Sequence, residues 1–452
     1  MKKNFIGIGV GIAILLIVYL GISAYFMNHF YFNTSINSVN VSGDTVNNAI
    51  TKVEDKLNNF KIELILENGD KEYITSKDIG LNVNLSEAIE QLKDRQAPFA
   101  WIFRIFNKNY TTLDIATEYD TGVLNNYLNS INIFSKGVSP KEPTFKYVNG
   151  QYEILKQVEG NKVDKEKLDK DILNAVENNK AVINLKEDNC YQKPKYTETS
   201  PEVLRAKEVL DKYVNTKITF TFGDNNTVLT GDTISGWLSV NKDMNVVINE
   251  AAVAKYVKTL ATKYNTVGKA RPFKTSLGNT VIVSGGDYGW KLNEAAETDK
   301  IIESIKQGEN INMNLIFSQK EANYGEDGVG NTYVEVNLGL QKVWLYKDGK
   351  LVIESDTVTG NVSEKHGTPP GYYYVKYKEK NARLKGENYD VPVKYWMPFN
   401  GGIGLHDADW RNKFGGDIYL KSGSHGCVNL PPNVAETIFN NISAGTPVVC
   451  YN

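Results

Sequence analysis

The sequence predicts a membrane-anchored multidomain chain with one transmembrane helix, two α+β modules and a C-terminal, mostly β domain. Three observations lead to this prediction. An uncharged apolar run follows two N-terminal lysines, a strand–turn–helix–strand pattern occurs twice in the middle of the chain, and short alternating strands with Gly/Pro turns fill the C-terminal end. At 452 residues the chain is also too long for one ordinary hydrophobic core.

The apolar run from Phe5 to Met27 is long enough to cross a membrane. At about 1.5 Å per residue a helix of this length reaches about 35 Å, against a hydrocarbon core of about 30 Å. The two lysines favour a cytoplasmic N-terminus, which places everything after Asn28 outside the cytoplasm. A cleavable signal peptide is the alternative. Because the run is longer than an ordinary signal core, we expect residues 1–32 to form a cytoplasmic tail and an uncleaved anchor in the cell membrane.

The middle of the chain contains one pattern twice. An alternating stretch, a turn and a second apolar string occur at 60–81 and again at 218–238, and each copy continues through helical patterns to a further strand. We therefore expect two α+β modules, which occupy 33–195 and 196–322.

Two segments interrupt this modular pattern. The first copy carries an apolar insertion around Phe99–Phe106, which is either a core helix or an exposed patch, and we expect it in the core. Gly325, Gly328 and Gly330 predict a flexible junction before the C-terminal domain.

The C-terminal domain, 331–452, has the texture of a β-sandwich or barrel. Apolar residues alternate from Val334 to Leu340, and a hairpin turns at Lys347–Lys350. Further strands are predicted at Tyr372–Tyr377, Ile418–Leu420 and Thr446–Cys450, with a helix near Pro432–Asn441.

Composition narrows the possible partners. The chain is 41% hydrophobic and 23% charged, with 51 basic against 53 acidic residues. No long basic run occurs, which argues against nucleic acid as a partner. Three cysteines are too few for a disulfide framework. Because Cys190 and Cys450 fall in different predicted domains, we expect both thiols to be reduced.

One segment of the C-terminal domain holds residues typical of a thiol active site. Cys427 lies among small residues, with His425 beside it and His406 some twenty residues earlier. A thiol is a nucleophile only as thiolate, so a nearby imidazole must help it to ionise. Gly426 allows close approach of the backbone, and its N–H, with that of Cys427, could stabilise a developing oxyanion.

Two other interpretations of these residues were weighed. A lone cysteine is usually a small buried hydrophobe. The two histidines and Cys427 could instead be three zinc ligands, but a structural zinc site needs four, and the closest further candidate is His366 in a Pro/Gly turn. We expect a nucleophile, and no metal or organic cofactor.

The arrangement resembles a known family. His406 followed by the run Ser424-His425-Gly426-Cys427-Val428-Asn429 is similar to the signature of the L,D-transpeptidase catalytic domain, the YkuD-like fold of bacterial cell-wall enzymes. His366–Gly371 and Tyr395–Phe399 also resemble segments of this family. The paired modules resemble peptidoglycan-binding modules that lie between anchor and catalytic domain in some relatives, although a rigid spacer would serve as well.

The resemblance implies a role for each site residue. Cys427 is the nucleophile and His406 the general base. Asp407, or a backbone carbonyl in its place, orients the imidazole, and His425 assists or packs. Gly426 supplies an oxyanion N–H. Tyr395 and Trp396 line the substrate cleft or, as aromatic side chains more commonly do, pack in the interior. Ser424 and Asn429 are placed with the substrate-binding residues, although both are expected to bond within their loop.

The implied reaction is acyl transfer on peptidoglycan stem peptides outside the cell. Cys427 displaces D-Ala from a stem tetrapeptide, and an amine of a neighbouring stem resolves the thioester to give a 3→3 cross-link. If water resolves it, the same site is an L,D-carboxypeptidase, and if the site is inert, the chain is a wall-binding scaffold. Carbapenem β-lactams are expected to acylate Cys427.

Overall fold

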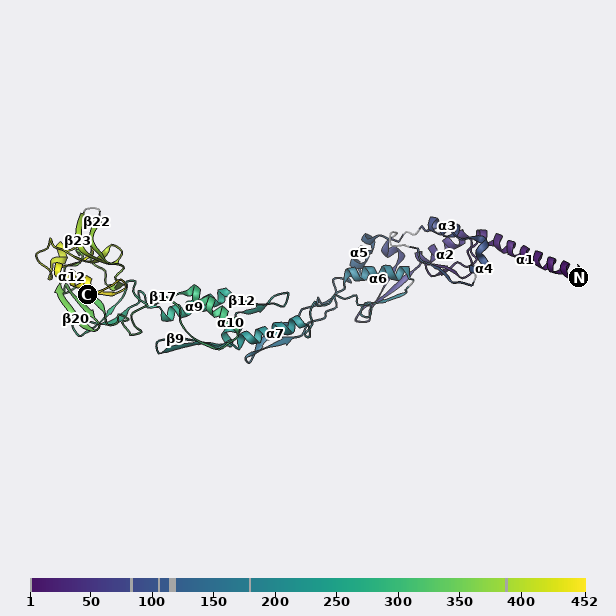
Figure 1. Ribbon diagram of the computed structural model, residues 1–452. Helices are drawn as coiled ribbons and strands as arrows, with labels where there is room; N and C mark the ends of the chain where they lie inside the picture. Colours follow the sequence, from purple (N-terminus) through teal and green to yellow (C-terminus); the bar gives the residue numbers. More distant parts are fainter. Residues whose placement is uncertain (1, 82–83, 105, 114–118, 179, 387–388) are drawn as a thin grey trace. The chain divides into compact units, whose positions relative to one another are not determined.

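The computed structural model describes residues 2–81, 84–104, 106–113, 119–178, 180–386 and 389–452 (Figure 1). The chain divides into two compact units, and each is described by itself. The first comprises Met1–Thr144 and Ile154–Val203, and the second comprises Phe145–Glu153 and Leu204–Asn452.

The first unit begins with the long helix α1 (Lys2–Asn28), drawn in purple in Figure 1. Large apolar side chains along most of its described length are exposed, whereas Ser23 and Phe26, near its end, are buried against the rest of the unit. The stretch Gly7–Asn28 is long and apolar enough to cross a membrane.

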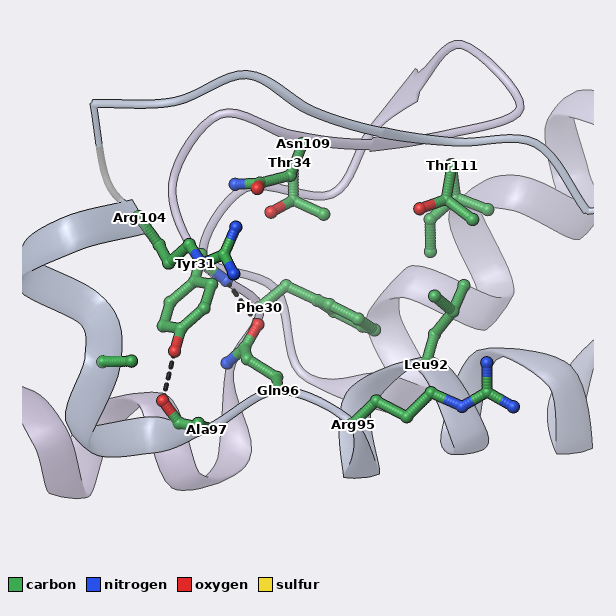
Figure 2. Close-up of a pocket in the computed structure, with 12 residues that line it drawn as sticks. Phe30, Tyr31, Thr34, Leu92, Arg95, Gln96, Ala97, Arg104, Asn109 and Thr111 are labelled. Atoms are coloured by element: carbon green, nitrogen blue, oxygen red, sulfur yellow. Dashed lines mark hydrogen bonds between the residues drawn. The ribbon is translucent and has the colours of Figure 1, made fainter.

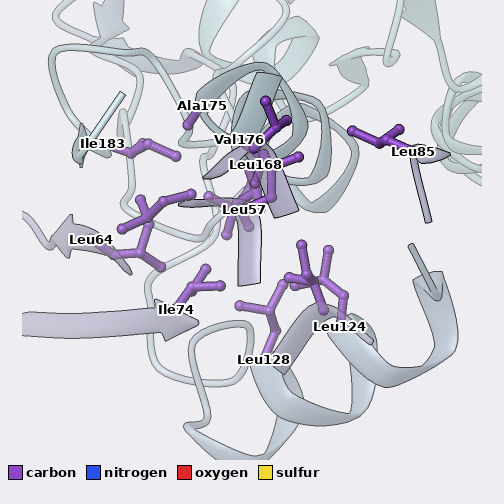
Figure 3. Close-up of a cluster of buried hydrophobic side chains, with 14 of the residues drawn as sticks. Leu57, Leu64, Ile74, Leu85, Leu124, Leu128, Leu168, Ala175, Val176 and Ile183 are labelled. Carbon is purple, nitrogen blue, oxygen red and sulfur yellow. The ribbon is translucent and has the colours of Figure 1, made fainter. Parts of the chain in front are cut away.

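The rest of the first unit is built on the three-stranded sheet β4-β3-β8. Side chains of this sheet and of three amphipathic helices converge in one core, where Leu57, Leu64, Leu124 and Leu168 meet (Figure 3). Each of these helices begins after a Thr or Asp whose side chain accepts a backbone N–H, the usual way to satisfy a free helix N-terminus. The elements of this core are β3 (Lys61–Ile65), β4 (Lys71–Thr75), β8 (Val182–Asn184), α2 (Val46–Asn58), α5 (Thr121–Ser130) and α6 (Lys165–Glu177). Around them lie β1 (Thr34–Ile36), β2 (Val39–Asn40), η1 (Ser76–Ile79), α3 (Ser86–Asp94), η2 (Pro98–Ala100), α4 (Trp101–Arg104) and β5 (Asn109–Thr111).

The second unit contains a sheet of the same design, β10-β9-β16. In both sheets an antiparallel hairpin is joined by a late strand that runs parallel to its first strand. This shared topology confirms the predicted pair of α+β modules. The elements of the second module are β9 (Ile218–Phe222), β10 (Asn225–Leu229), α8 (Gly231–Ser235), β11 (Leu238–Val240), β12 (Val246–Ile248), α9 (Glu250–Tyr264), β15 (Lys291–Leu292), α10 (Glu294–Gln307), β16 (Ile311–Asn314) and β17 (Phe317–Gln319). Helix α7 (Pro201–Val214) precedes them.

A hairpin that comes early in the sequence belongs to the second unit. Strands β6 (Thr144–Val148) and β7 (Gln151–Leu155) lie within the first predicted module along the chain. Tyr152 nevertheless lies in the core of the second module, where its N–H donates to the Asp211 carboxylate at 2.7 Å.

The corresponding hairpin of the second module, β13 (Arg271–Lys274) and β14 (Thr280–Val283), packs against the C-terminal domain. Beside it, Arg271 and Glu321 form a buried ion pair with Nη1 and Oε1 2.6 Å apart. The carbonyl of Gly328 accepts a hydrogen bond from Tyr288 Oη at 2.9 Å, and Val329 is buried. This packed junction differs from the flexible one that the glycines predict.

Two sheets form the C-terminal domain, as predicted. One has the order β20-β19-β18-β26-β21 and the other β22-β23-β24-β25. Their facing residues, with helix α12 (Pro432–Asn441), enclose the core around Val336, Met397, Leu405 and Val428. The strands are β18 (Tyr333–Asn337), β19 (Lys342–Lys347), β20 (Lys350–Asp356), β21 (Gly371–Tyr374), β22 (Glu379–Gly386), β23 (Tyr389–Asn400), β24 (Ile403–Asp407), β25 (Val428–Leu430) and β26 (Pro447–Tyr451).

Two local predictions are wrong. Ile418–Leu420 is not a strand but lies in the short helix α11 (Ile418–Ser422), because three residues carry too little periodicity to tell the two apart. The insertion Phe99–Phe106 is not in the core, since Phe103 and Phe106 are exposed. The core of the first module is formed by other elements, among them α2, α3, α5 and α6, and no described residue of the insertion belongs to it. Position 105 of this segment lies outside the described residues.

Candidate active site

Two neighbouring parallel strands bring His406 and Asn429 side by side. Strands β24 and β25 pair so that His406 lies opposite Asn429 and Leu405 opposite Val428. Leu405 and Val428 point into the core between the sheets. Because successive strand residues face opposite sides, the polar pair emerges on the other face, where both residues line a cavity.

A tight loop holds Cys427 at the start of β25. The Ser424 hydroxyl donates to the Cys427 carbonyl at 2.6 Å and accepts the Gly426 N–H at 3.1 Å, while the Thr368 hydroxyl donates to the Gly426 carbonyl at 2.7 Å. Gly426 has φ of +120°, and a Cβ there would lie 3.0 Å from the Ile403 side chain. The loop therefore requires glycine at this position.

His406 is buried, and both ring nitrogens are engaged. Nδ1 lies 2.8 Å from the Asp407 carbonyl, which can only accept, so Nδ1 carries the proton. Nε2 lies 2.9 Å from Nδ2 of Asn429, from which it accepts. Burial lowers the pKa of His406 below its ordinary value, and the bond to Asp407 opposes this only in part. The ring is therefore neutral at physiological pH, with its lone pair on Nε2.

The orientation of Asn429 is fixed by an arginine that sequence reasoning missed. Arg411 Nε donates to Asn429 Oδ1 at 2.9 Å, and Arg411 Nη1 donates to the Ser422 carbonyl at 2.8 Å. The amide oxygen is thus occupied, and the NH₂ group faces the imidazole. Asn429 is therefore a buried partner of His406. Arg411 follows the His406 strand closely in sequence, but no spacing rule connects it to Asn429.

The Asp407 carboxylate faces away from the imidazole. Its Oδ1 accepts the Tyr395 backbone N–H at 2.8 Å, across the β23–β24 ladder. Only the backbone carbonyl of Asp407 reaches His406. Of the two orienting groups considered from the sequence, the carbonyl makes the contact, because adjacent strand residues point to opposite faces.

The Cys427 thiol is half-buried at the wall of the cavity. Its Sγ lies 3.6 Å from the Gly402 carbonyl, a weak hydrogen bond in which the thiol donates. Burial raises the pKa of Cys427 to about 11, and a backbone hydrogen bond from Gly404 acts in the opposite direction. At neutral pH the thiol is therefore almost entirely protonated, and it needs a proton acceptor to react.

The cavity has a volume of about 400 Å³ and gathers most of the predicted site. Of the predicted residues it is lined by Cys427, His406, His425, Ser424, Asn429 and Trp396. The rings of Trp396 and Trp410 each lie 5.9 Å from that of His406. The β22–β23 hairpin adds Arg383, Leu384, Lys385 and Val391. Sequence reasoning missed this hairpin because its first strand is almost entirely polar.

Of the other predicted residues, Tyr395 and His425 pack against neighbouring rings, and Gly426 differs from expectation. The Tyr395 ring packs 5.3 Å from that of Phe439, and the residue is not among those lining the cavity. His425 is exposed, with its ring 5.0 Å from that of His366. The Gly426 N–H is already bound to Ser424, so it is not free to meet an oxyanion in this state. Among the described residues no group of three His, Cys, Asp or Glu side chains is placed to hold a metal ion.

Comparisons with known proteins agree with this geometry. Residues 331–450 match the YkuD family, the L,D-transpeptidase catalytic domain, and residues 72–184 and 197–312 each match a domain family described as peptidoglycan binding. A comparison with curated proteins gives no match.

Several solved structures are similar to this chain in sequence. A cysteine-to-serine mutant of the Enterococcus faecium L,D-transpeptidase is 35% identical, over 54% of this chain and 98% of its own, with a TM-score of 0.47. A carbamoyl enzyme formed by Ldtfm with avibactam is also 35% identical, over 55% and 99%, with a TM-score of 0.48. The E. faecium catalytic domain acylated by ertapenem is 46% identical, over 27% and 97%, with a TM-score of 0.25. The matches to these two families, which together cover more than half of the chain, show that it belongs to the L,D-transpeptidases, with a YkuD catalytic domain preceded by two peptidoglycan-binding-type modules.

Proposed function

We propose that this chain cross-links peptidoglycan stem peptides through a thioester on Cys427. One observation carries the proposal: a partly accessible thiol and a buried imidazole line the same cavity. A nucleophile with a general base at hand is the arrangement that acyl transfer requires.

In the first step Cys427 Sγ attacks the carbonyl that joins the third stem residue to the terminal D-Ala. The thiol proton passes to Nε2 of His406, the ring nitrogen that holds the lone pair. The C–N bond then breaks, and the imidazolium returns this proton to the departing amine of D-Ala. The acyl group remains on sulfur as a thioester.

In the second step an amine of a neighbouring stem attacks the thioester. His406 takes a proton from the amine, the C–S bond breaks, and the proton returns to sulfur. A 3→3 cross-link and the free thiol result. Both steps use one base in alternating protonation states, which suits a ring whose pKa lies below 6.5 and which releases its proton readily.

Asn429 and Arg411 act as positioning residues in this scheme. In the resting state the Asn429 amide donates to Nε2, which holds the Nδ1–H tautomer. When the thiol proton arrives, the amide must yield this bond. We assign the oxyanion donor to the Cys427 N–H, because Ser424 occupies that of Gly426.

The cavity also suits the substrate class. Arg383, Lys385 and Arg411 line the cavity beside two tryptophan rings, and the pairing of the first two with Asp390 offsets only part of their positive charge. A stem tetrapeptide ends in a carboxylate, which cationic side chains would attract. The same attraction and the thiol would allow a carbapenem to acylate Cys427, as ertapenem acylates the E. faecium domain.

Intact-protein mass spectrometry tests the reaction. The full chain in detergent is incubated with tetrapeptide stems, alone and with an added amine acceptor. We expect an acyl adduct on Cys427, release of D-Ala and cross-linked dimers. Tripeptide without dimers would instead assign the L,D-carboxypeptidase activity, and no adduct and no product would leave only a wall-binding scaffold.

We also propose the cellular arrangement. Helix α1, within 1–32, stays uncleaved in the cell membrane, and the modules of 33–195 and 196–322 hold the catalytic domain of 331–452 toward the wall outside. The apolar length of Gly7–Asn28 and the two peptidoglycan-binding matches support this placement. An N-terminus that retains Met1 or Lys2 in the membrane-extracted protein is the expected result, whereas a chain beginning after the helix would identify a signal peptide.

A further inference from the structure

The insertion Phe99–Phe106 brings several large exposed apolar side chains together in one short stretch of the first module. The exposed fractions are 51% for Phe99, 45% for Ile102, 78% for Phe103 and 83% for Phe106. Contiguous exposed apolar groups of this kind mark a surface that meets something other than water.

The insertion lies against helix α1. When α1 spans the membrane, the point of contact is at a depth that water does not reach. Tyr19 Oη donates to the Phe99 carbonyl at 2.6 Å, and the rings of Tyr19 and Trp101 are 5.9 Å apart. If the hydrocarbon core begins after Lys3, about 20 residues cross it, so its far boundary falls near Ala24. Tyr19 then lies about 7 Å inside that boundary, and whatever touches it is inside the outer leaflet.

Polar contacts attach the residues just before the insertion to the end of helix α1. Lys93 Nζ donates to the Phe26 carbonyl at 2.8 Å, and Gln96 Nε2 donates to the carbonyls of Phe26 and His29 at 3.1 and 2.8 Å. These bonds satisfy carbonyls at the C-terminus of α1, which have no partner within the helix. The insertion is therefore held at one height relative to the anchor.

Cationic side chains lie at the level of this helix end. A pocket of about 230 Å³ beside the insertion is lined by Arg95 and Arg104, together with Gln96 and Asn109 (Figure 2). Figure 2 shows the Arg104 side chain reaching over Tyr31. Neither guanidinium has an ion-pair partner among the residues that the structure describes. Guanidinium groups bind phosphate oxygens in pairs of hydrogen bonds.

We propose that the insertion is a second membrane-contact element: the side chains of Phe99, Ile102, Phe103 and Phe106 enter the outer leaflet of the bilayer. Arg95 and Arg104, which extend in different directions (Figure 2), each bind a phosphate of a phospholipid headgroup. The occupant is lipid because the surface is continuous with the membrane-spanning helix and because cations rim its apolar side. This inference rests on the proposed uncleaved anchor. Its consequence is that the first module sits on the bilayer surface and does not swing freely on α1.

Spin-label accessibility in the full chain tests the depth of the insertion. Labels are placed through Phe103→Cys, Leu15→Cys and Val138→Cys, each in a Cys427→Ala background, and the protein is reconstituted in phosphatidylglycerol/phosphatidylcholine vesicles. Val138 is the matched control, an exposed apolar residue of the same unit, and Leu15 reports the anchor. We expect the labels at 15 and 103 to favour collision with oxygen, and that at 138 to favour an aqueous nickel chelate.

The outcomes separate this inference from the proposed anchor. A label at 103 that behaves like the one at 138, while that at 15 reads as hydrocarbon, overturns the membrane contact and leaves the anchor in place. Aqueous labels at both 15 and 103 overturn both.

The headgroup contact has its own test. The double variant Arg95→Gln/Arg104→Gln is compared with the parent in phosphatidylglycerol vesicles and in galactolipid vesicles that lack phosphate. We expect deeper immersion of a Phe106→Cys label in the phospholipid for the parent, and loss of that difference in the double variant. An unchanged difference would overturn the phosphate assignment.

Discussion

The second unit contains two buried polar networks, of which one is enclosed at a domain junction and the other borders a cavity. At the junction of the second module with the catalytic domain, Glu321 accepts from Arg271, from the Thr266 hydroxyl and from the Trp290 N–H. The side chains of Arg271 and Glu321 are only 7% and 1% exposed. At the catalytic site, Arg411, Asn429 and His406 form a chain of similar polarity that ends on a cavity.

The difference shows that a shifted pKa does not by itself identify a catalytic group. Burial shifts the pKa of both groups: it raises the pKa of Glu321 and lowers the pKa of His406. The Glu321 carboxylate accepts hydrogen bonds from structural donors in a closed interior. His406 keeps a basic nitrogen beside a cavity that also holds a thiol, and only that arrangement is suited to the proposed chemistry.

The largest expected effect concerns the thiol. Cys427→Ala should lower cross-linking by about 10⁴-fold or more, because it removes the thiol of the cavity, and the Ser424 hydroxyl that also lines it is bound to the backbone of residue 427. Turnover and denaturant unfolding are measured together. As a control, Cys450→Ala at a fully buried position should cost about 1 kcal/mol of stability and leave the activity of the folded protein unchanged. Cross-linking at the parent rate in Cys427→Ala would refute the nucleophile assignment.

The structural network should respond in stability and not in turnover. Arg271→Met leaves Glu321 buried without its cation, which should lower the free energy of unfolding by about 3–5 kcal/mol. The double variant Arg271→Met/Glu321→Leu should recover much of this loss, because no charge is then stranded. Turnover per folded molecule should match the parent in both. A selective loss of turnover would join the junction to the catalytic machinery and remove the contrast between the networks.

Asn429 should affect catalysis through His406. Asn429→Ala should lower kcat by about 10²-fold, the scale of a misplaced catalytic group. Because the amide donates to the lone pair of Nε2, its removal should raise the pKa of His406 and move the acid limb of the pH–rate profile to higher pH. Asn433→Ala, exposed on α12, is the matched control. A smaller kcat with an unmoved acid limb would mean that Asn429 is only structural.

The smallest effect is on stability at low pH. The pKa of His406 is lower in the folded protein than in the unfolded chain, so the unfolded chain binds more protons below about pH 6.5. The contribution of His406 to the free energy of unfolding is complete above pH 6.5. It decreases as the pH drops below this value, by at most about 1.4 kcal/mol per pH unit. Unfolding at pH 7.5 and 5.5 is compared with His406→Gln, which should lack this part of the slope. Equal slopes would argue against a buried neutral imidazole.

Much of this architecture could be predicted because its signals are local. Strand alternation and turn residues predict both modules, and the spacing from His406 to Cys427 predicts the site. The opposite facing of the Asp407 carboxylate also follows from strand alternation, once His406 is placed on a strand. The contact between Arg411 and Asn429 could not be predicted, since it depends on the register of β24 against β25. The exposure of Phe103 depends on which helices close the first core, which no local pattern reveals.

Alkylation of Cys427 as a function of pH tests the central claim most directly, namely that thiol and imidazole are both neutral until substrate arrives. The rate of reaction with iodoacetamide is followed by intact-protein mass spectrometry, with the buried Cys190 and Cys450 as internal controls. We expect a slow rate at pH 7 that rises continuously beyond pH 9, since the pKa of Cys427 is raised to about 11. A fast rate that is already constant at pH 6 would reveal a preformed thiolate–imidazolium pair and contradict the account.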